Sequence, residues 1–138
     1  MSIFMIVSAA ALFFGAIIGL GGLIWPKWAQ NVVRLVPDPD FDKPGGYSEF
    51  RATYGGLFLM LHLTGLLIIS QPDIADMFKI FTVLPIAAAW VGAGFGRTLS
   101  LLLDPAENRR SGLIPVWIAT EIGLGIMIAA PLFDVLLF

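Results

Sequence analysis

Several charged residues lie within or at the edges of long apolar stretches of the sequence, among them Glu49, Arg51, Arg97 and Glu121, with Asp104 just beyond one stretch. A charged side chain near the centre of a bilayer costs about 3 kcal/mol or more, so such residues usually pair and face the interior of a helix bundle. Carboxylate and guanidinium groups in such a place can lock helices together, bind an anionic ligand or carry a proton. Both interpretations, a structural polar lock and a ligand site, are open from the sequence.

The elements that hold these charges are predicted to be membrane helices. Hydrophobic residues make up 58% of the chain and mean hydropathy is +0.89, values that a soluble domain of this length would not tolerate. Four apolar stretches, at about 3–25, 49–70, 75–103 and 112–137, are each long enough to cross a bilayer. The predicted fold is therefore all-α, a single integral membrane four-helix bundle over residues 1–138, with a short interfacial helix at about 26–36 in the first loop.

Basic residues in the short loops predict the orientation of these helices. They fall mainly on one side, with Lys27, Arg34 and Lys43 in loop one and Arg109 and Arg110 in loop three. The opposite side has only Lys79. The positive-inside rule then makes loops one and three cytoplasmic and both termini periplasmic, in a bacterial inner (plasma) membrane.

This topology places Glu49, Arg51, Arg97, Asp104 and Glu121 in the cytoplasmic half. Side chains tilt toward the N-terminus of their helix, so Arg97 points deeper into the membrane and Glu121 points back toward the cytoplasm. The two are predicted to meet at a common depth as an ion pair. Arg51 is predicted to form a second pair, with Glu49 or with Asp104, nearer the surface.

His62 is the only histidine and lies deep in the second predicted helix. A lone histidine makes a poor catalyst, and no second histidine accompanies it. A hydrogen-bonded packing role is favoured over the alternative, a single axial ligand to a haem or chlorophyll.

No metal site is predicted. The chain has no cysteine, which excludes disulfides and thiolate-bound metals or clusters. Asp38, Asp40 and Asp42, followed by Glu49, have the spacing of a calcium-binding loop, but Lys43 stands where that loop needs glycine. A solvated acidic turn is the better interpretation.

Small residues recur at the four-residue spacing that lets membrane helices approach closely. One stripe, Ala11, Gly15 and Gly19, lies on the first predicted helix, and another, Ala88, Gly92 and Gly96, lies on the third. These faces are expected to pack against neighbouring helices of the chain or against a partner protein.

The segment Glu49-Phe50-Arg51-Ala52-Thr53-Tyr54-Gly55-Gly56 opens the second predicted helix, and Arg97-Thr98-Leu99-Ser100-Leu101 precedes Asp104. With these segments the sequence resembles, over most of its length, a family of small bacterial four-helix membrane proteins catalogued only as a domain of unknown function. The resemblance implies a four-helix bundle with a shared polar cluster and implies no activity. The candidate cluster, structural or ligand-binding, comprises Glu49, Arg51, Tyr54, Arg97, Asp104 and Glu121. Pro105 departs from the glycine that often follows the aspartate in that family.

Two functions are weighed for this chain. Its small size, its small-residue stripes and its lack of a nucleophile or metal set favour a non-catalytic accessory or scaffolding subunit. Such a subunit would belong to a larger membrane complex, for example a bioenergetic one, or to a homo-oligomer. The alternative is a binding or transport module for a small anionic or amphipathic ligand such as a lipid or a quinone-like molecule, held by Arg51 and Arg97. An enzyme is the weakest option. No cofactor is predicted, although a bound lipid, quinone or pigment is possible. The net charge of −2 does not indicate nucleic-acid binding.

Overall fold

A computed structural model of the chain describes residues 1–35, 42, 46–105 and 113–137. All regular secondary structure in these residues is helical. The chain divides into two compact units: unit 1 comprises Met1–Ala11 and Ile68–Phe138, and unit 2 comprises Leu12–Leu67. Helix α1 (Ile3–Ile24) contributes its first half to unit 1 and its second half to unit 2.

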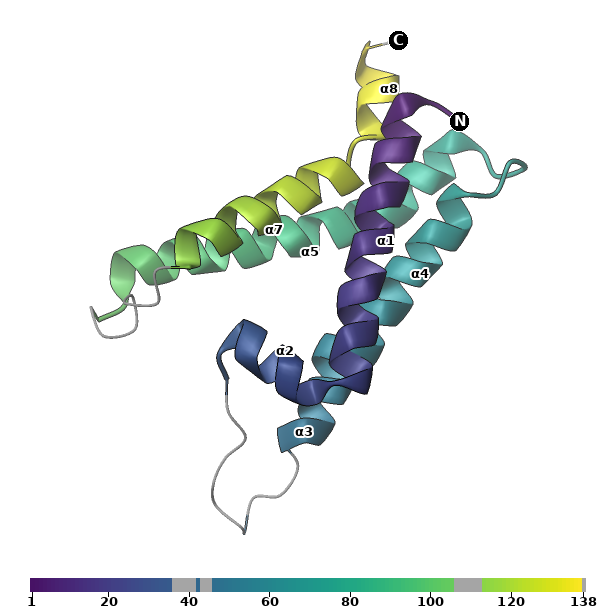
Figure 1. Ribbon diagram of the computed structural model, residues 1–138. Coiled ribbons are helices and arrows are strands. Elements are labelled where there is room, and N and C mark those ends of the chain that lie inside the picture. Colours follow the sequence, from purple (N-terminus) through teal and green to yellow (C-terminus); the bar gives the residue numbers. More distant parts are fainter. Residues whose placement is uncertain (36–41, 43–45, 106–112, 138) are drawn as a thin grey trace. The chain divides into compact units, whose positions relative to one another are not determined.

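Unit 2 contains the second half of α1, then α2 (Pro26–Val33), α3 (Gly46–Glu49), the π-helix η1 (Phe50–Leu57) and most of α4 (Phe58–Ile69) (Figure 1). Pro26 begins α2, where a missing backbone N–H costs nothing. Arg34 ends α2 in a left-handed conformation, with φ of 58°, and its N–H bonds to the Gln30 carbonyl. The short helix predicted at about 26–36 therefore exists over Pro26–Val33.

The second predicted helix, 49–70, is found as three consecutive helical segments between Gly46 and Ile69, of which η1 is π-helical. No sequence pattern indicated the π-helical turns. Eight residues span only about two turns, too few for apolar spacing to distinguish a wider helix from an α-helix.

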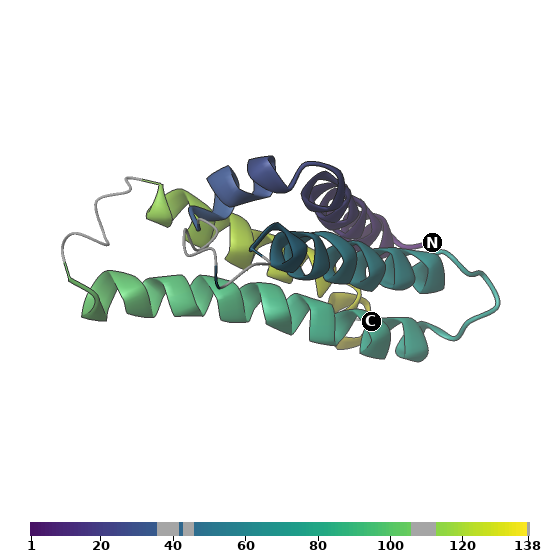
Figure 2. The same ribbon diagram turned by 90° about the horizontal axis from the view of Figure 1, so that it is seen from below.

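Unit 1 is built on α5 (Asp76–Leu103) and α7 (Ile114–Ile128), which run side by side (Figures 1 and 2). Ile80, Val83 and Ala87 of α5 are buried, as are Leu124 and Ile128 of α7. Although Pro85 lies inside it, α5 is assigned as one helix over all 28 residues.

The last predicted helix, 112–137, is not continuous, because α7 ends at Ile128 and a separate helix α8 (Leu132–Leu137) follows. Pro131 explains the break, since it has no N–H to continue the ladder and its ring would clash with the preceding turn. The Ile128 carbonyl accepts a 2.7 Å hydrogen bond from the hydroxyl of Ser8, a fully buried residue of α1. Ser8 thus satisfies a carbonyl at the end of α7.

Three helical segments in the described part of the chain are long and apolar enough to cross a membrane: Ile3–Ile24, Gly46–Ile69 and Asp76–Leu103. This is consistent with a membrane protein. Helix α7 is apolar but has only 15 residues, about 22 Å of helix.

Candidate functional site

Arg97 of α5 and Glu121 of α7 form an ion pair inside unit 1. The Arg97 Nε donates a 2.7 Å hydrogen bond to Glu121 Oε1. The side chain of Glu121 is 8% exposed and that of Arg97 is 35% exposed, so the carboxylate is buried while part of the guanidinium is open. The two residues that the sequence predicted to converge do pair.

Two glycines bring α5 and α7 close together beside this pair. A Cβ atom at Gly94, one turn before Arg97, would lie 2.7 Å from the Ile122 side chain and 3.5 Å from the Cβ of Glu121. A Cβ atom at Gly125, one turn after Glu121, would lie 2.9 Å from the Ala87 carbonyl oxygen. The ion pair therefore sits where the absence of side chains lets the helices make close contact.

The pair leaves hydrogen-bonding capacity unused on both sides. Glu121 Oε2 is buried and has no partner among the described residues. Within the same part of the chain, the only hydrogen bond of Arg97 is the one from Nε, so its Nη1 and Nη2 groups have no acceptor. A guanidinium end of this kind matches the two oxygens of a carboxylate or phosphate.

Arg51 of η1 hydrogen-bonds to a backbone carbonyl, and its pairing with Asp104 stays a prediction because Asp104 belongs to unit 1. In unit 2 its Nη1 donates a 2.5 Å hydrogen bond to the backbone carbonyl of Leu23, in the last turn of α1. The described residues of unit 2 contain no ion pair between Arg51 and Glu49, and in unit 1 Asp104 accepts a hydrogen bond from Ser100 of α5. The carbonyls in the last turn of a helix lack intrahelical donors and carry partial negative charge, which makes Leu23 a suitable acceptor.

Tyr54 and His62 belong to a row of rings along η1 and α4 in unit 2. The ring centroids of Phe50 and Tyr54 are 5.7 Å apart, those of Tyr54 and Phe58 are 6.5 Å apart, and those of Phe58 and His62 are 5.5 Å apart. His62 is 2% exposed, and its Nδ1 lies 2.6 Å from the Phe58 carbonyl oxygen, as a donor to it. This geometry supports the hydrogen-bonded packing role for His62.

The two predicted small-residue stripes differ in outcome. A Cβ atom at Gly15 would lie 2.1 Å from the His62 ring, and one at Gly19 would lie 2.4 Å from the Leu59 backbone nitrogen, so the α1 stripe does bring helices together. Ala11, the third residue of this stripe, is also buried. On α5, by contrast, no described atom of unit 1 lies within 4 Å of a Cβ at Gly92 or Gly96, and Ala88 is exposed.

The α5 stripe therefore does not form the expected intramolecular packing face in unit 1. Gly94, which the sequence analysis did not single out, makes the close contact with α7 instead. Successive helical residues are rotated by about 100°, so Gly94 points about 200° away from Gly92, to the opposite face. Packing of the Ala88, Gly92 and Gly96 face against a partner remains a prediction.

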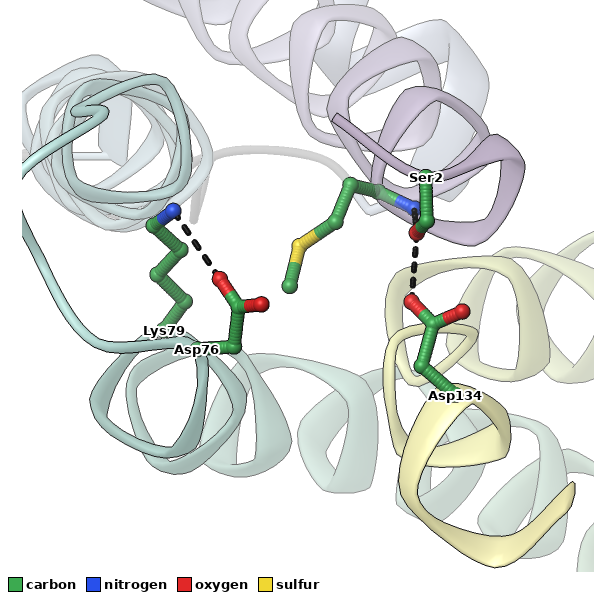
Figure 3. Close-up of polar contacts among 5 residues, drawn as sticks. Ser2, Asp76, Lys79 and Asp134 are labelled. Atoms are coloured by element: carbon green, nitrogen blue, oxygen red, sulfur yellow. Dashed lines mark hydrogen bonds and ion pairs between the residues drawn. The ribbon is translucent and has the colours of Figure 1, made fainter. Parts of the chain in front are cut away.

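A second polar cluster in unit 1 was missed by the sequence analysis (Figure 3). Lys79 donates a 3.1 Å hydrogen bond to Asp76 Oδ1, and the Ser2 hydroxyl donates to Asp134 Oδ2. The Ser2 oxygen also accepts the backbone N–H of Met5 at 3.1 Å, as an N-cap of α1 does. The three-residue spacing of Asp76 and Lys79 was the signal available in the sequence.

The described residues contain no group of three or more side chains of the metal-binding types. Most of the acidic turn, including Asp38 and Asp40, lies outside the described residues.

Comparison with known proteins identifies one family. The model of the domain of unknown function DUF4345 matches residues 2–131, almost the whole chain. This confirms the resemblance to a family of unknown function. Neither the curated proteins nor the solved structures contain a match.

Proposed function

Because this chain belongs to the DUF4345 family, for which no function is assigned, we propose a function from its own residues: a non-catalytic membrane protein that binds the acidic group of an amphiphile through Arg97. The observation that carries the proposal is the half-used ion pair. Arg97 is held at Nε by Glu121, while Nη1 and Nη2 have no acceptor in the described part of the chain.

Glu121 acts as the positioning group in this proposal. Its Oε1 accepts the hydrogen bond from Arg97 Nε and so fixes the orientation of the guanidinium. The Nη1 and Nη2 groups at the other end then point in a defined direction and can donate to a ligand. A guanidinium held in this way loses less side-chain entropy when it binds a carboxylate or phosphate. The unpartnered Oε2 can accept a hydrogen bond from a hydroxyl or a protonated oxygen of the same ligand.

The proposal also includes the membrane topology. Helices α1, η1 with α4, and α5 would each cross the bilayer, and α7 with α8 would provide the fourth crossing of a four-helix bundle. The basic residues Lys27 and Arg34 would lie on the cytoplasmic side of a bacterial inner membrane, and both termini would lie on the periplasmic side. In this topology Arg97 lies six residues before the cytoplasmic end of α5, about 9 Å of helix.

The test compares lipid retention by the purified chain and by Arg97→Gln. Both proteins are placed in nanodiscs of phosphatidylcholine with a minor fraction of phosphatidylglycerol, then extracted gently and analysed by native mass spectrometry. We expect Arg97→Gln to weaken phosphatidylglycerol retention by about tenfold or more, because a charge-assisted hydrogen bond contributes about 1.5–3 kcal/mol. Lys27→Gln, which removes a basic side chain of α2, is the matched control and should retain lipid normally.

Equal phosphatidylglycerol retention by a well-folded Arg97→Gln variant would contradict the proposal. The ion pair would then be a polar lock only. Circular dichroism and gel filtration of the variant establish that it is folded.

A second candidate function, an accessory or scaffolding subunit of a larger membrane complex, is favoured by the open face of α5. Ala88, Gly92 and Gly96 line this face, and within unit 1 nothing packs on the two glycines. Small residues allow a helix of another membrane protein to approach closely. Mild detergent extraction should then yield a stoichiometric complex, and recovery of the chain alone under several mild conditions would count against it.

A further inference from the structure

The cluster at the N-terminal end of α5 contains a buried positive charge that the proposed function does not use. Lys79 is 8% exposed, and eighteen residues separate it from Arg97, about 27 Å along the helix. Its nearest carboxylate, Asp76, has a side chain that is 72% exposed. Because solvent screens an exposed carboxylate, Asp76 compensates the buried ammonium only in part.

Most of the hydrogen-bonding capacity of Lys79 is also unused. An ammonium group has three N–H donors, and in the described residues Lys79 makes one hydrogen bond, to Asp76. The carboxylate of Asp134 accepts from Ser2 (Figure 3). Leaving donors of a buried charged group unpaired is costly, so the site favours an additional oxygen acceptor.

Lys79 lines a cavity that has room for such an acceptor. The cavity has a volume of about 370 Å³, within the range of small-molecule sites. Ser2, Asp76 and Lys79 give it a polar side, and Met5, Ile69 and Pro72 give it an apolar side. A small anion with a short hydrocarbon part fits both sides.

We propose that this cavity binds an oxyanion, a phosphate or carboxylate group whose oxygens accept hydrogen bonds from the Lys79 ammonium. The same group could come from a free solute or from a lipid headgroup, because Lys79 lies in the first turn of α5, near one end of a candidate membrane span. The site is independent of the Arg97 proposal, since it uses none of the same residues.

The experiment measures the NMR signals of the lysine side chains during titration with an anion. The chain has three lysines, Lys27, Lys43 and Lys79, so protein labelled with ¹³C at lysine Cε gives a simple NMR spectrum that single substitutions assign. The full chain in a neutral detergent is titrated with inorganic phosphate at constant ionic strength. We expect a saturable shift of the Lys79 signal while the Lys27 and Lys43 signals stay nearly constant.

Two substitutions make the result specific. Asp76→Asn removes the carboxylate that competes with the anion, so phosphate should bind up to about fivefold more tightly, the scale of an exposed ion pair. Lys79→Gln should weaken binding by about tenfold or more. Phosphate protection against thermal unfolding reports binding to this variant, with Lys27→Gln as the matched control. A structural pair without a ligand would not become a tighter anion site when Asp76 is replaced.

A second arm distinguishes the two sources of the anion. The labelled protein is placed in nanodiscs of phosphatidylcholine with and without phosphatidylglycerol, with no free phosphate. A Lys79 shift with phosphatidylglycerol but not with free phosphate identifies a lipid headgroup, and the reverse identifies a solute. The proposal is overturned if Lys79 shows no saturable response in either arm, or if all three lysines shift equally.

Discussion

Arg97 in unit 1 and Arg51 in unit 2 are both arginines in apolar helices, yet they are held in different ways. Arg97 pairs with the buried carboxylate of Glu121 on a facing helix. Arg51 is exposed and donates to the Leu23 backbone carbonyl at the end of α1. One arginine compensates a buried charge, whereas the other caps a helix end.

The helix contacts around the two arginines differ as well. Beside Arg97, the Cβ position of Gly94 faces a flexible isoleucine side chain. Near Arg51, a Cβ at Gly22 would lie 2.4 Å from the Tyr54 carbonyl oxygen, and one at Gly55 would lie 2.7 Å from the Leu23 backbone. Near Arg51 both glycines face backbone atoms, whereas beside Arg97 only Gly125 does so, and the contact between α5 and α7 also includes a charged pair.

The largest effect is expected from breaking the ion pair of unit 1 on one side. Arg97→Met leaves the buried Glu121 carboxylate without its partner, which should lower the free energy of unfolding by about 3 kcal/mol. Arg97→Met with Glu121→Met should recover most of this loss, because apolar residues often replace a buried pair at little cost. Equilibrium unfolding in mixed micelles of dodecyl maltoside and sodium dodecyl sulfate measures both variants. Losses that simply add in the double variant would show that the two side chains do not depend on each other.

A smaller loss is expected from closing the backbone contact of unit 2. Gly55→Ala should lower the free energy of unfolding by about 2 kcal/mol, because the new methyl group meets the Leu23 backbone, which cannot move aside easily. The adjacent Gly56→Ala is the matched control, since its nearest atom would be the Arg51 carbonyl oxygen at an ordinary 3.6 Å. The control should be neutral, or more stable by up to about 1 kcal/mol from helix propensity. Equal losses at both positions would mean that Gly55 is not at a close helix contact.

The comparison also shows which contacts the sequence could predict. Counting residues from the helix ends placed Arg97 and Glu121 at one depth, and this was sufficient because Glu121 is the only charged residue of α7 and Arg97 is the only one in the second half of α5. The acceptor of Arg51 was not predictable in this way, because every residue has a backbone carbonyl. A sequence pattern cannot tell which of them lies next to the guanidinium.

For the small residues, too, the sequence did not show which helix face has a neighbour. The four-residue spacing of Gly92 and Gly96 predicted a packing face, but spacing does not tell whether that face has a neighbour. Gly94 does not belong to the four-residue series of small residues, so the series did not indicate it, although it is the α5 glycine that contacts α7. Lys79 was used only as a charge on one side of the membrane. It is buried and lines a cavity with Ser2 and Met5, which are more than 70 residues away in the sequence, so no local pattern indicated its burial.

The smallest effect tests the partner of Arg51 itself. Arg51→Gln should lower the free energy of unfolding by about 1 kcal/mol, through loss of the charge-assisted hydrogen bond to the Leu23 carbonyl at an exposed position. Glu49→Gln should change stability by less than about 0.5 kcal/mol, because Glu49 is exposed and makes no ion pair with the described residues. If Arg51 instead paired with Glu49, both substitutions would remove the same interaction and the double variant would lose no more than either single one. The mixed-micelle unfolding of these three variants therefore separates a helix cap from the ion pair that the sequence predicted.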